Sequence, residues 1–187
     1  MVPTRVAVAT SSTLRAQAGR YAQMALAAGA AVAEVIPAHR VVTGDWVRLK
    51  CQFGCSGYNR RLCCPPRTPT PEQTRRVIAE YRLAVIWAFD APGSGRPSTR
   101  WLKLPAHIER AAFLEGRHKA LGFGAGPCRL CADCNIAGRC RHPEAARPAM
   151  EACGIDVYAT CRNAGIELEV VANRRQVPRY VQLVLLD

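Results

Sequence analysis

Cysteine placement constrains this chain more than any other feature of its sequence. Eight of the ten cysteines fall into two short segments, 51–64 and 128–140. The first residues have no charged head followed by a long apolar core, so we expect no secretory signal and a reducing cytoplasm. In such a compartment, clustered thiols usually bind metal rather than form disulfides. The two segments are therefore predicted to be irregular metal-binding loops.

The second segment carries the more specific motif. Cys128, Cys131, Cys134 and Cys140 follow the spacing C-x2-C-x2-C-x5-C. Three thiolates at successive x2 spacings wrap a tight loop around three corners of a cube, as a [4Fe–4S] cluster requires. The last gap is longer than in a bacterial ferredoxin, so Cys140 either closes this cluster or reaches another one. Structural zinc is the competing interpretation, but it usually takes two C-x2-C pairs separated by a longer spacer.

The first segment contains a sparser motif, C-x3-C-x8-C-P-P, formed by Cys51, Cys55 and Cys64. A cysteine followed by proline is similar to the end of the ferredoxin motif, where proline turns the chain away from the cluster. Gly54 and Gly57 would allow backbone amides to approach inorganic sulfide closely. We therefore predict one or two [4Fe–4S] clusters in the chain, with this segment holding the second.

The first motif is one ligand short of a closed cluster. Cys63 and Cys64 point in opposite directions in an extended backbone, so both are not expected to bind one cluster. Cys153 or Cys161 supplies the fourth ligand, or they remain small core residues. If neither binds, one iron is open and acts as a Lewis acid toward a substrate. The predicted metal ligands are Cys51, Cys55, Cys64, Cys128, Cys131, Cys134, Cys140 and Cys153.

On these residues the chain resembles the "predicted metal-binding protein" family of bacteria and archaea, a domain of unknown function. The resemblance covers about residues 45–187 and implies metal binding by an iron–sulfur group, with no activity established for the family. The matching features are the C-x3-C-x8-C-P-P motif, the motif of Cys128 to Cys140 with Pro143, and the runs ARPAMEA at 146–152 and GIDV at 154–157. The doubled Cys63 and Cys64 replaces the single cysteine expected before the prolines.

Hydrophobic patterning predicts a single α+β domain over residues 1–187, a mostly antiparallel sheet with helices on one face. Residues 82–90 form the clearest buried strand, and 166–171 with 179–186 are predicted to form a hairpin with a turn near 173–176. Helices are expected at 11–28, 71–81, 105–121, 143–152 and 157–163, with further strands at 33–37, 41–42 and 46–50.

Charge suggests the kind of partner. The net charge is +12, and arginines flank both cysteine segments: Arg60, Arg61, Arg67, Arg129, Arg139 and Arg141. Such residues partly offset the negative charge of a cluster and would attract an acidic redox protein. Nucleic acid is a less favoured acidic partner, because no helix-turn-helix or zinc-finger spacing is present. No apolar run is long enough to span a membrane.

Three functions are compatible with these motifs. The favoured one is an iron–sulfur protein that carries single electrons to an acidic partner. The second is an enzyme that uses the open iron of a three-cysteine cluster on a small molecule. The third is a zinc protein that binds nucleic acid. In all three, Arg147 with Glu151 is expected to support the second cysteine loop or to form a charged helix turn.

Overall fold

The computed structural model describes residues 11–91, 97–173 and 175–187. It contains five α-helices, four strands and two 3₁₀ turns in the described ranges. In chain order they are α1 (Ser11–Ala27), β1 (Val32–Pro37), η1 (Ala38–Arg40), α2 (Asp45–Gly54), α3 (Pro71–Ile78), β2 (Leu83–Asp90), α4 (Thr99–Leu114), β3 (Leu121–Phe123), η2 (Glu151–Cys153), α5 (Val157–Ala164) and β4 (Arg179–Leu186).

The four strands form one antiparallel sheet in the order β1-β2-β4-β3. β2 pairs with β4 along its whole length, from Leu83 opposite Leu186 to Asp90 opposite Arg179. Residues 83–89 of β2 are all buried. A continuous apolar strand of this kind needs cover on both of its faces, so β2 fixes the layered architecture around it.

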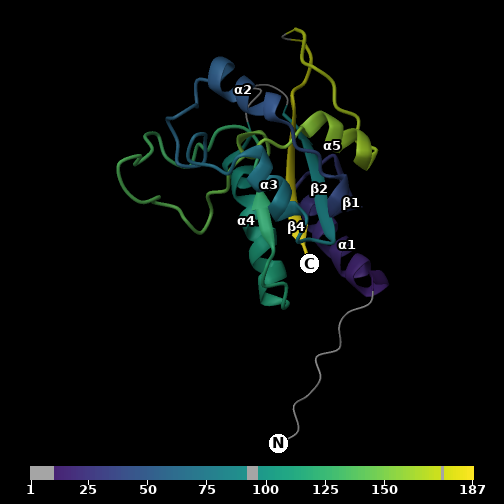
Figure 1. Ribbon diagram of the computed structural model, residues 1–187. Helices are drawn as coiled ribbons and strands as arrows, with labels where there is room; N and C mark the ends of the chain where they lie inside the picture. The colour runs from purple at the N-terminus through teal and green to yellow at the C-terminus, as the bar shows by residue number, and fades with distance from the viewer. Residues whose placement is uncertain (1–10, 92–96, 174) are drawn as a thin grey trace, which may run out of the picture.

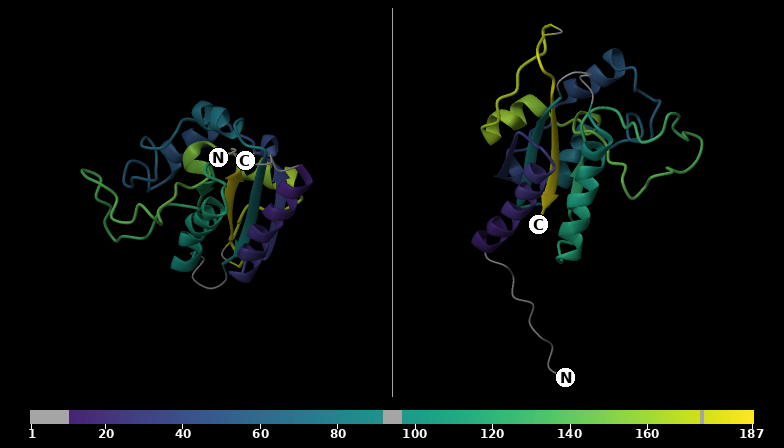
Figure 2. Two further views of the ribbon diagram at one scale, coloured as in Figure 1. Left: turned by 90° about the horizontal axis from the view of Figure 1, so that it is seen from below. Right: turned by 180° about the vertical axis from the view of Figure 1, so that it is seen from behind.

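Helices cover both faces of the sheet. On one face α1 and α4 pack against residues that include Trp87 and Phe89, and on the other η2 and α5 pack against residues that include Ile86 and Leu183. Figures 1 and 2 show the sheet between these layers. The predicted class, α+β with an antiparallel sheet, is confirmed. The expectation of helices on one face only is wrong, because both sides of β2 are apolar.

The segment 46–50 is helical, not the strand its β propensity suggests. Gly44 takes the N-cap position of α2, and Asp45 lies in the first turn, where a carboxylate is favourable beside free N–H groups. Val47 is the buried residue of this helix, whereas Trp46 and Phe53 are exposed. The local start signal therefore outweighs the intrinsic preference of the side chains for strand.

Other predicted elements also differ. Residues 166–171 and 41–42 form no strand, and the turn of the predicted hairpin includes residue 174, which lies outside the described residues. The edge beside β4 is taken by β3 instead. The helix predicted at 143–152 is reduced to η2, because Pro148 offers no N–H inside it. The helix predicted at 105–121 is α4, which starts earlier, at Thr99, because the Ser98 side chain caps it by accepting a hydrogen bond from the Trp101 N–H.

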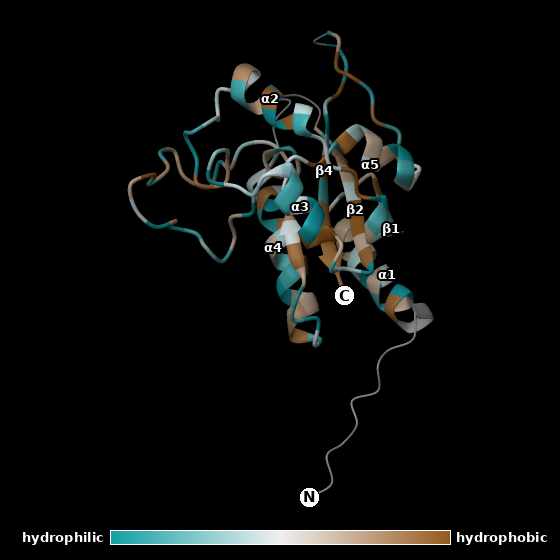
Figure 3. Cartoon of the chain, viewed as in Figure 1, coloured by the Kyte–Doolittle hydropathy of each residue, from teal (hydrophilic) through white to brown (hydrophobic). Residues whose placement is uncertain are grey.

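Two irregular segments project from one side of the sheet, residues 55–70 after α2 and residues 124–150 after β3. Figure 1 shows them side by side, in blue and green, away from the strands. Figure 3 shows that hydrophobic residues concentrate along the strands, whereas the projecting segments are mixed. In the described part of the chain, no helix is long and apolar enough to cross a membrane.

Candidate metal centre

Three cysteines from α2 and the segment after it form what we call the first thiol group: Cys51, Cys55 and Cys64. Cys51 lies in the last turns of α2, and Cys55 is its C-cap. The Cys55 sulfur accepts a hydrogen bond from the Gly57 N–H at 3.4 Å. Burial raises the pKa of the Cys64 thiol to about 11. The three side chains line one large cavity together.

Gly57 is packed tightly between the first thiol group and the other projecting segment. A Cβ at this position would lie 3.2 Å from Pro127 Cβ, 3.5 Å from Cys55 Sγ and 3.6 Å from Cys64 Sγ. The Gly57 backbone therefore lies close to cysteine sulfur, whereas its predicted approach to inorganic sulfide stays a prediction. Gly54, by contrast, has nothing within 4 Å of its Cβ position.

Five cysteines line a second, smaller cavity and form the second thiol group: Cys63, Cys128, Cys131, Cys134 and Cys140. Backbone amides point at its sulfurs, since Leu62 N–H donates to Cys134 at 3.4 Å and His142 N–H donates to Cys140 at 3.4 Å. The Arg61 guanidinium donates to the Cys131 carbonyl at 2.8 Å. The segment 61–63 is thereby joined to the loop 128–142.

The adjacent Cys63 and Cys64 belong to different thiol groups. Cys63 donates a hydrogen bond to the Cys128 sulfur, which raises the pKa of Cys63 and lowers the pKa of Cys128 to about 6. Sequence reasoning assigned Cys64 to the first motif but gave Cys63 no partner. Because neighbouring side chains point in opposite directions, the sequence does indicate that Cys63 and Cys64 face different sites. It does not show that the loop 128–140 lies beside Cys63.

Cys153 of η2 and Cys161 of α5 belong to the hydrophobic core that these two elements form with the sheet. Both side chains are completely buried, and burial raises the pKa of each to about 12. The Cys153 carbonyl accepts a hydrogen bond from the Thr74 hydroxyl at 2.7 Å. Neither is among the described residues that line the two cavities.

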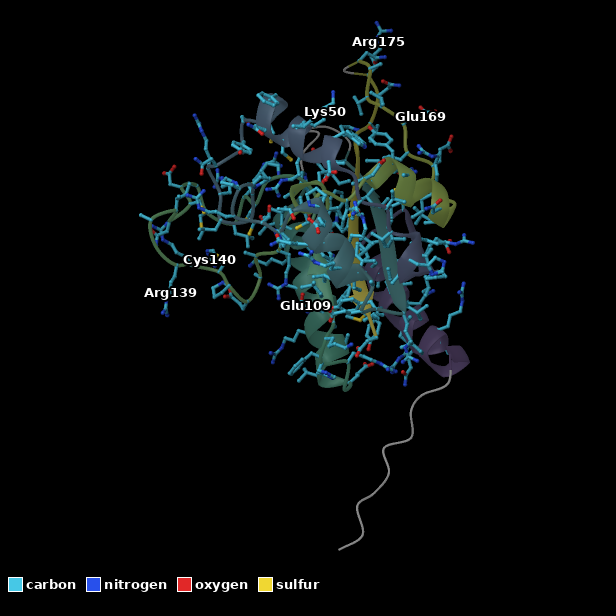
Figure 4. All side chains as sticks on the ribbon, in the orientation of Figure 1. Lys50, Glu109, Arg139, Cys140, Glu169 and Arg175 are labelled. Carbon is cyan, nitrogen blue, oxygen red and sulfur yellow. The ribbon has the colours of Figure 1, made fainter. Side chains whose placement is uncertain are left out.

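The cavity beside the first thiol group has a volume of about 680 Å³. Its walls come from α2, the loop around Gly126, η2, the start of α5 and the segment 168–171. Lys50 and Glu169 line it from different segments, α2 and 168–171, and both are labelled in the upper part of Figure 4. Apolar residues that line it are also exposed to solvent: Trp46, Tyr158, Val170 and Val171. A cavity of this size admits a small organic molecule.

Arg147 holds the end of the second cysteine loop to α4. Its guanidinium forms two hydrogen bonds with the Glu109 carboxylate, 2.7 Å from Nε to Oε2 and 2.5 Å from Nη2 to Oε1. It also donates to the Pro143 and Ala146 carbonyls at 3.1 Å and 2.8 Å. Both side chains of the pair are less than one-fifth exposed. Arg147 therefore supports the loop as expected, but its acidic partner is Glu109 and not Glu151.

Glu151 has a different setting from the one predicted. It begins η2 and lines the large cavity, and its carbonyl accepts a 3.8 Å hydrogen bond from Cys51 Sγ. Its Oε2 is shielded from solvent and has no hydrogen-bond partner among the described residues. Burial raises the pKa of this carboxyl above its ordinary value.

Exposed arginines surround the second thiol group. Arg60, Arg67, Arg129, Arg139 and Arg141 are all exposed. Figure 4 shows Arg139 and Cys140 on the outer part of the projecting loop, well away from Glu109 on α4. Arg141 donates to the Asp133 carbonyl at 3.1 Å, and Arg67 donates to the Asn59 side chain at 2.5 Å. The two projecting segments therefore carry more positive than negative charge, with Asp133 and Glu144 as their acidic residues.

The thiols of each group line one cavity, but their side chains are not arranged around a single metal ion. Within residues 11–91, 97–173 and 175–187, no three His, Cys, Asp or Glu side chains stand close enough to hold a single metal ion. The donor chemistry is nevertheless that of a soft-metal site, because the polar side chains that line the second cavity are mostly thiols.

A family model described as "predicted metal-binding protein (DUF2284)" matches residues 34–186. The match takes in both thiol groups and all of the sheet except the first two residues of β1, Val32 and Ala33. No curated protein and no solved structure matches the chain significantly.

Proposed function

The chain belongs to the DUF2284 family of predicted metal-binding proteins, and from that premise we propose that it is an iron–sulfur protein. In this proposal two [4Fe–4S] clusters occupy the two thiol groups and pass single electrons to a redox partner. Bound clusters of this kind supply reversible one-electron chemistry. The observation that carries the proposal is the division of eight thiols between two adjacent cavities, with Cys63 and Cys64 on opposite sides of the division.

Iron–sulfur clusters fit the donor set better than zinc does. A tetrahedral zinc site with Zn–S bonds of about 2.3 Å draws its four sulfurs to within about 4 Å of one another. Each iron of a cubane takes a single external thiolate, so a cluster is served by thiols that stand further apart around one cavity. The amides of Gly57, Leu62 and His142 that donate to cysteine sulfurs are the outer-shell contacts that tune such a cluster.

Electron exchange with a partner is supported by the position of the second thiol group. It lies in the projecting loops and not under the helices (Figure 1). The exposed arginines around it would attract an acidic protein, as predicted, and accelerate its association at low salt. In our proposal the second cluster therefore exchanges electrons with the partner, and the first cluster receives or supplies them within the molecule.

One observation favours a second function, reduction or activation of a small molecule at the first cluster. Only the first thiol group faces the cavity of about 680 Å³. With three thiols on four irons, one iron remains available to a group other than thiolate, and an iron in that position acts as a Lewis acid. The two functions are compatible, because electrons that enter at the second cluster can be used at the first.

The test is an anaerobic reductive titration followed by electron paramagnetic resonance. We expect roughly two electrons taken up per chain and signals from two interacting clusters. The reduced protein should then reduce an acidic flavoprotein, at a rate that falls as salt rises. A protein that takes up no electrons, or that instead shifts oligonucleotides with a steep salt dependence, would overturn the proposal.

A further inference from the structure

We propose that the carboxylate of Glu151 binds the iron that the three thiols leave open, so that Cys51, Cys55, Cys64 and Glu151 together hold the first cluster. The inference rests on the proposed iron–sulfur function and adds a ligand to it. Carboxylate oxygen is an accepted ligand of protein-bound iron.

The first support is an unsatisfied polar atom. A buried carboxyl oxygen without a hydrogen bond costs free energy, so in a native protein it points to an ion or other group that completes it. Two buried side-chain oxygens in the described ranges lack a partner, Glu151 Oε2 and Asp187 Oδ1. Asp187 is the last residue, after β4, and does not line the cavity. Of these two residues, only Glu151 lines the cavity together with the thiols.

The second support is proximity. Glu151 and the three thiols line the same cavity, and the Cys51 thiol is hydrogen-bonded to the Glu151 carbonyl at 3.8 Å. A cluster held at these thiols would thus lie beside η2. The ligand of its fourth iron would come either from η2 or from a molecule in the cavity.

The third support is the way η2 is fixed to the cysteine-bearing segment. The Ala152 carbonyl accepts hydrogen bonds from Arg48 on α2 at 2.8 Å and from the Thr68 hydroxyl at 2.5 Å. Gly154, with φ +77, packs so closely on α3 that a Cβ would lie 2.4 Å from Pro71 Cγ. These contacts hold Glu151 in a constant position relative to Cys51 and Cys64, as a ligand requires.

Cys153 is the competing fourth ligand. It lies in the same turn, but its side chain is enclosed by the apolar core that contains Met150 and Ile155. To reach the cavity it would have to leave that core and expose it. Glu151, by contrast, already lines that cavity.

A carboxylate at this position has a chemical consequence. It carries the same formal charge as a thiolate but is a harder ligand, so it holds a soft iron–sulfur centre less firmly. A molecule that enters the cavity can therefore displace Glu151 from the iron, whereas it could not easily displace a cysteine.

The test compares wild type with four variants purified without oxygen: E151A, E151C, C153A and, as the matched control, E169A. Glu169 lines the same cavity but is exposed. The readouts are iron content, the electron paramagnetic resonance spectrum, and the spectral change on adding cyanide as the probe ligand. Circular dichroism checks that each variant keeps its fold.

We expect E151A to change the signal of one cluster and to bind cyanide at least tenfold more tightly than wild type does. E151C should restore a full complement of iron and abolish cyanide binding, and both C153A and E169A should match wild type. An unchanged signal in E151A, or loss of the first cluster in C153A, would overturn the inference. If wild type itself lacks iron and sulfide, the proposed function fails instead.

Discussion

At the scale of single residues, the pair Cys63 and Cys64 connects the two thiol groups. Neighbouring Cα atoms are about 3.8 Å apart, so clusters bound on either side of this pair would be separated by little more than two cysteine side chains. Burial is the main reason that the pKa of Cys64 is raised, and negative charge on the nearby cysteines, Cys128 of the second group among them, adds to it. Electron exchange between the two proposed clusters should accordingly be faster than exchange with a partner.

Separate replacement of the two residues should separate the clusters. We expect Cys64→Ser to remove the first cluster and about half of the iron, because only two thiols would remain there. Cys63→Ser should alter the second cluster's signal and leave the first in place. Electron paramagnetic resonance of the two reduced variants distinguishes these outcomes. Finding the same signal changed in both would contradict the assignment of the two cysteines to different groups.

Gly57 provides a second prediction at this scale. In Gly57→Ala the new methyl group would be crowded by Pro127 Cβ at 3.2 Å and would occupy the space directly beside the Cys55 and Cys64 sulfurs. We expect the first cluster to be lost or unstable while the fold survives, as measured by iron content and thermal unfolding. Gly19→Ala is the matched control, because nothing lies within 4 Å of its Cβ position in α1. Equal iron content in both variants would show that the close packing is unimportant.

At the scale of elements, the second cysteine loop depends on α4 for its position. Breaking a mostly buried ion pair costs about 3 kcal/mol or more, because one charge remains unpaired. We therefore expect Arg147→Ala to lower the free energy of unfolding by about this amount and to increase hydrogen exchange in residues 128–146. The control is Arg76→Ala in the exposed i,i+4 pair with Glu72, which should cost less than about 1 kcal/mol. Equal costs in chemical denaturation would refute a supporting role for Arg147.

The sequence predicts elements well where the pattern and the tertiary setting agree. The apolar run of β2 and the predicted helix start at Pro71 are confirmed, and in the structure Thr70 and Gln73 form a capping box at that start. The segments 46–50 and 166–171 have β-rich composition, but one has a helix start before it and the other has no sheet edge to join, since β3 occupies it. Such competition between segments is not visible in local composition.

In the candidate site, too, local patterns predict some features, whereas others depend on contacts between distant segments. The spacing of Cys128, Cys131 and Cys134 indicates a shared site without knowledge of the fold. The contribution of Cys63 and the roles of Glu109 and Glu151 depend on loops and helices far apart in sequence. Glu109 meets Arg147 across 38 residues, and Cys51 meets Glu151 across 100. No local pattern predicts contacts of that separation.

At the scale of the whole molecule, the core and the thiol groups are distinct parts. The sheet, with helices on both faces, buries its apolar residues in two clusters, to which the projecting segments contribute only Met150 among the described residues. The loop 124–150 has few backbone hydrogen bonds of its own and no helix or strand before η2. A long loop of this kind is usually functional, and here we expect bound metal to order it.

Metal removal should therefore act on one part of the molecule. After chelation under reducing conditions, we expect hydrogen exchange to rise strongly in residues 55–67 and 128–142 and to stay low in β2 and β4. The physical reason is that the strands keep their buried hydrogen bonds while the loops lose their cross-links. A uniform rise across the chain would mean that metal holds the whole fold together, and no rise in the loops would mean that metal does not order them.

Chemical analysis of iron and acid-labile sulfide, in protein purified without oxygen, tests the central claim most directly. Two [4Fe–4S] clusters correspond to about eight iron and about eight sulfide per chain, and we predict values close to these. A single occupied thiol group would give half of each. Stoichiometric zinc with no sulfide would contradict the account.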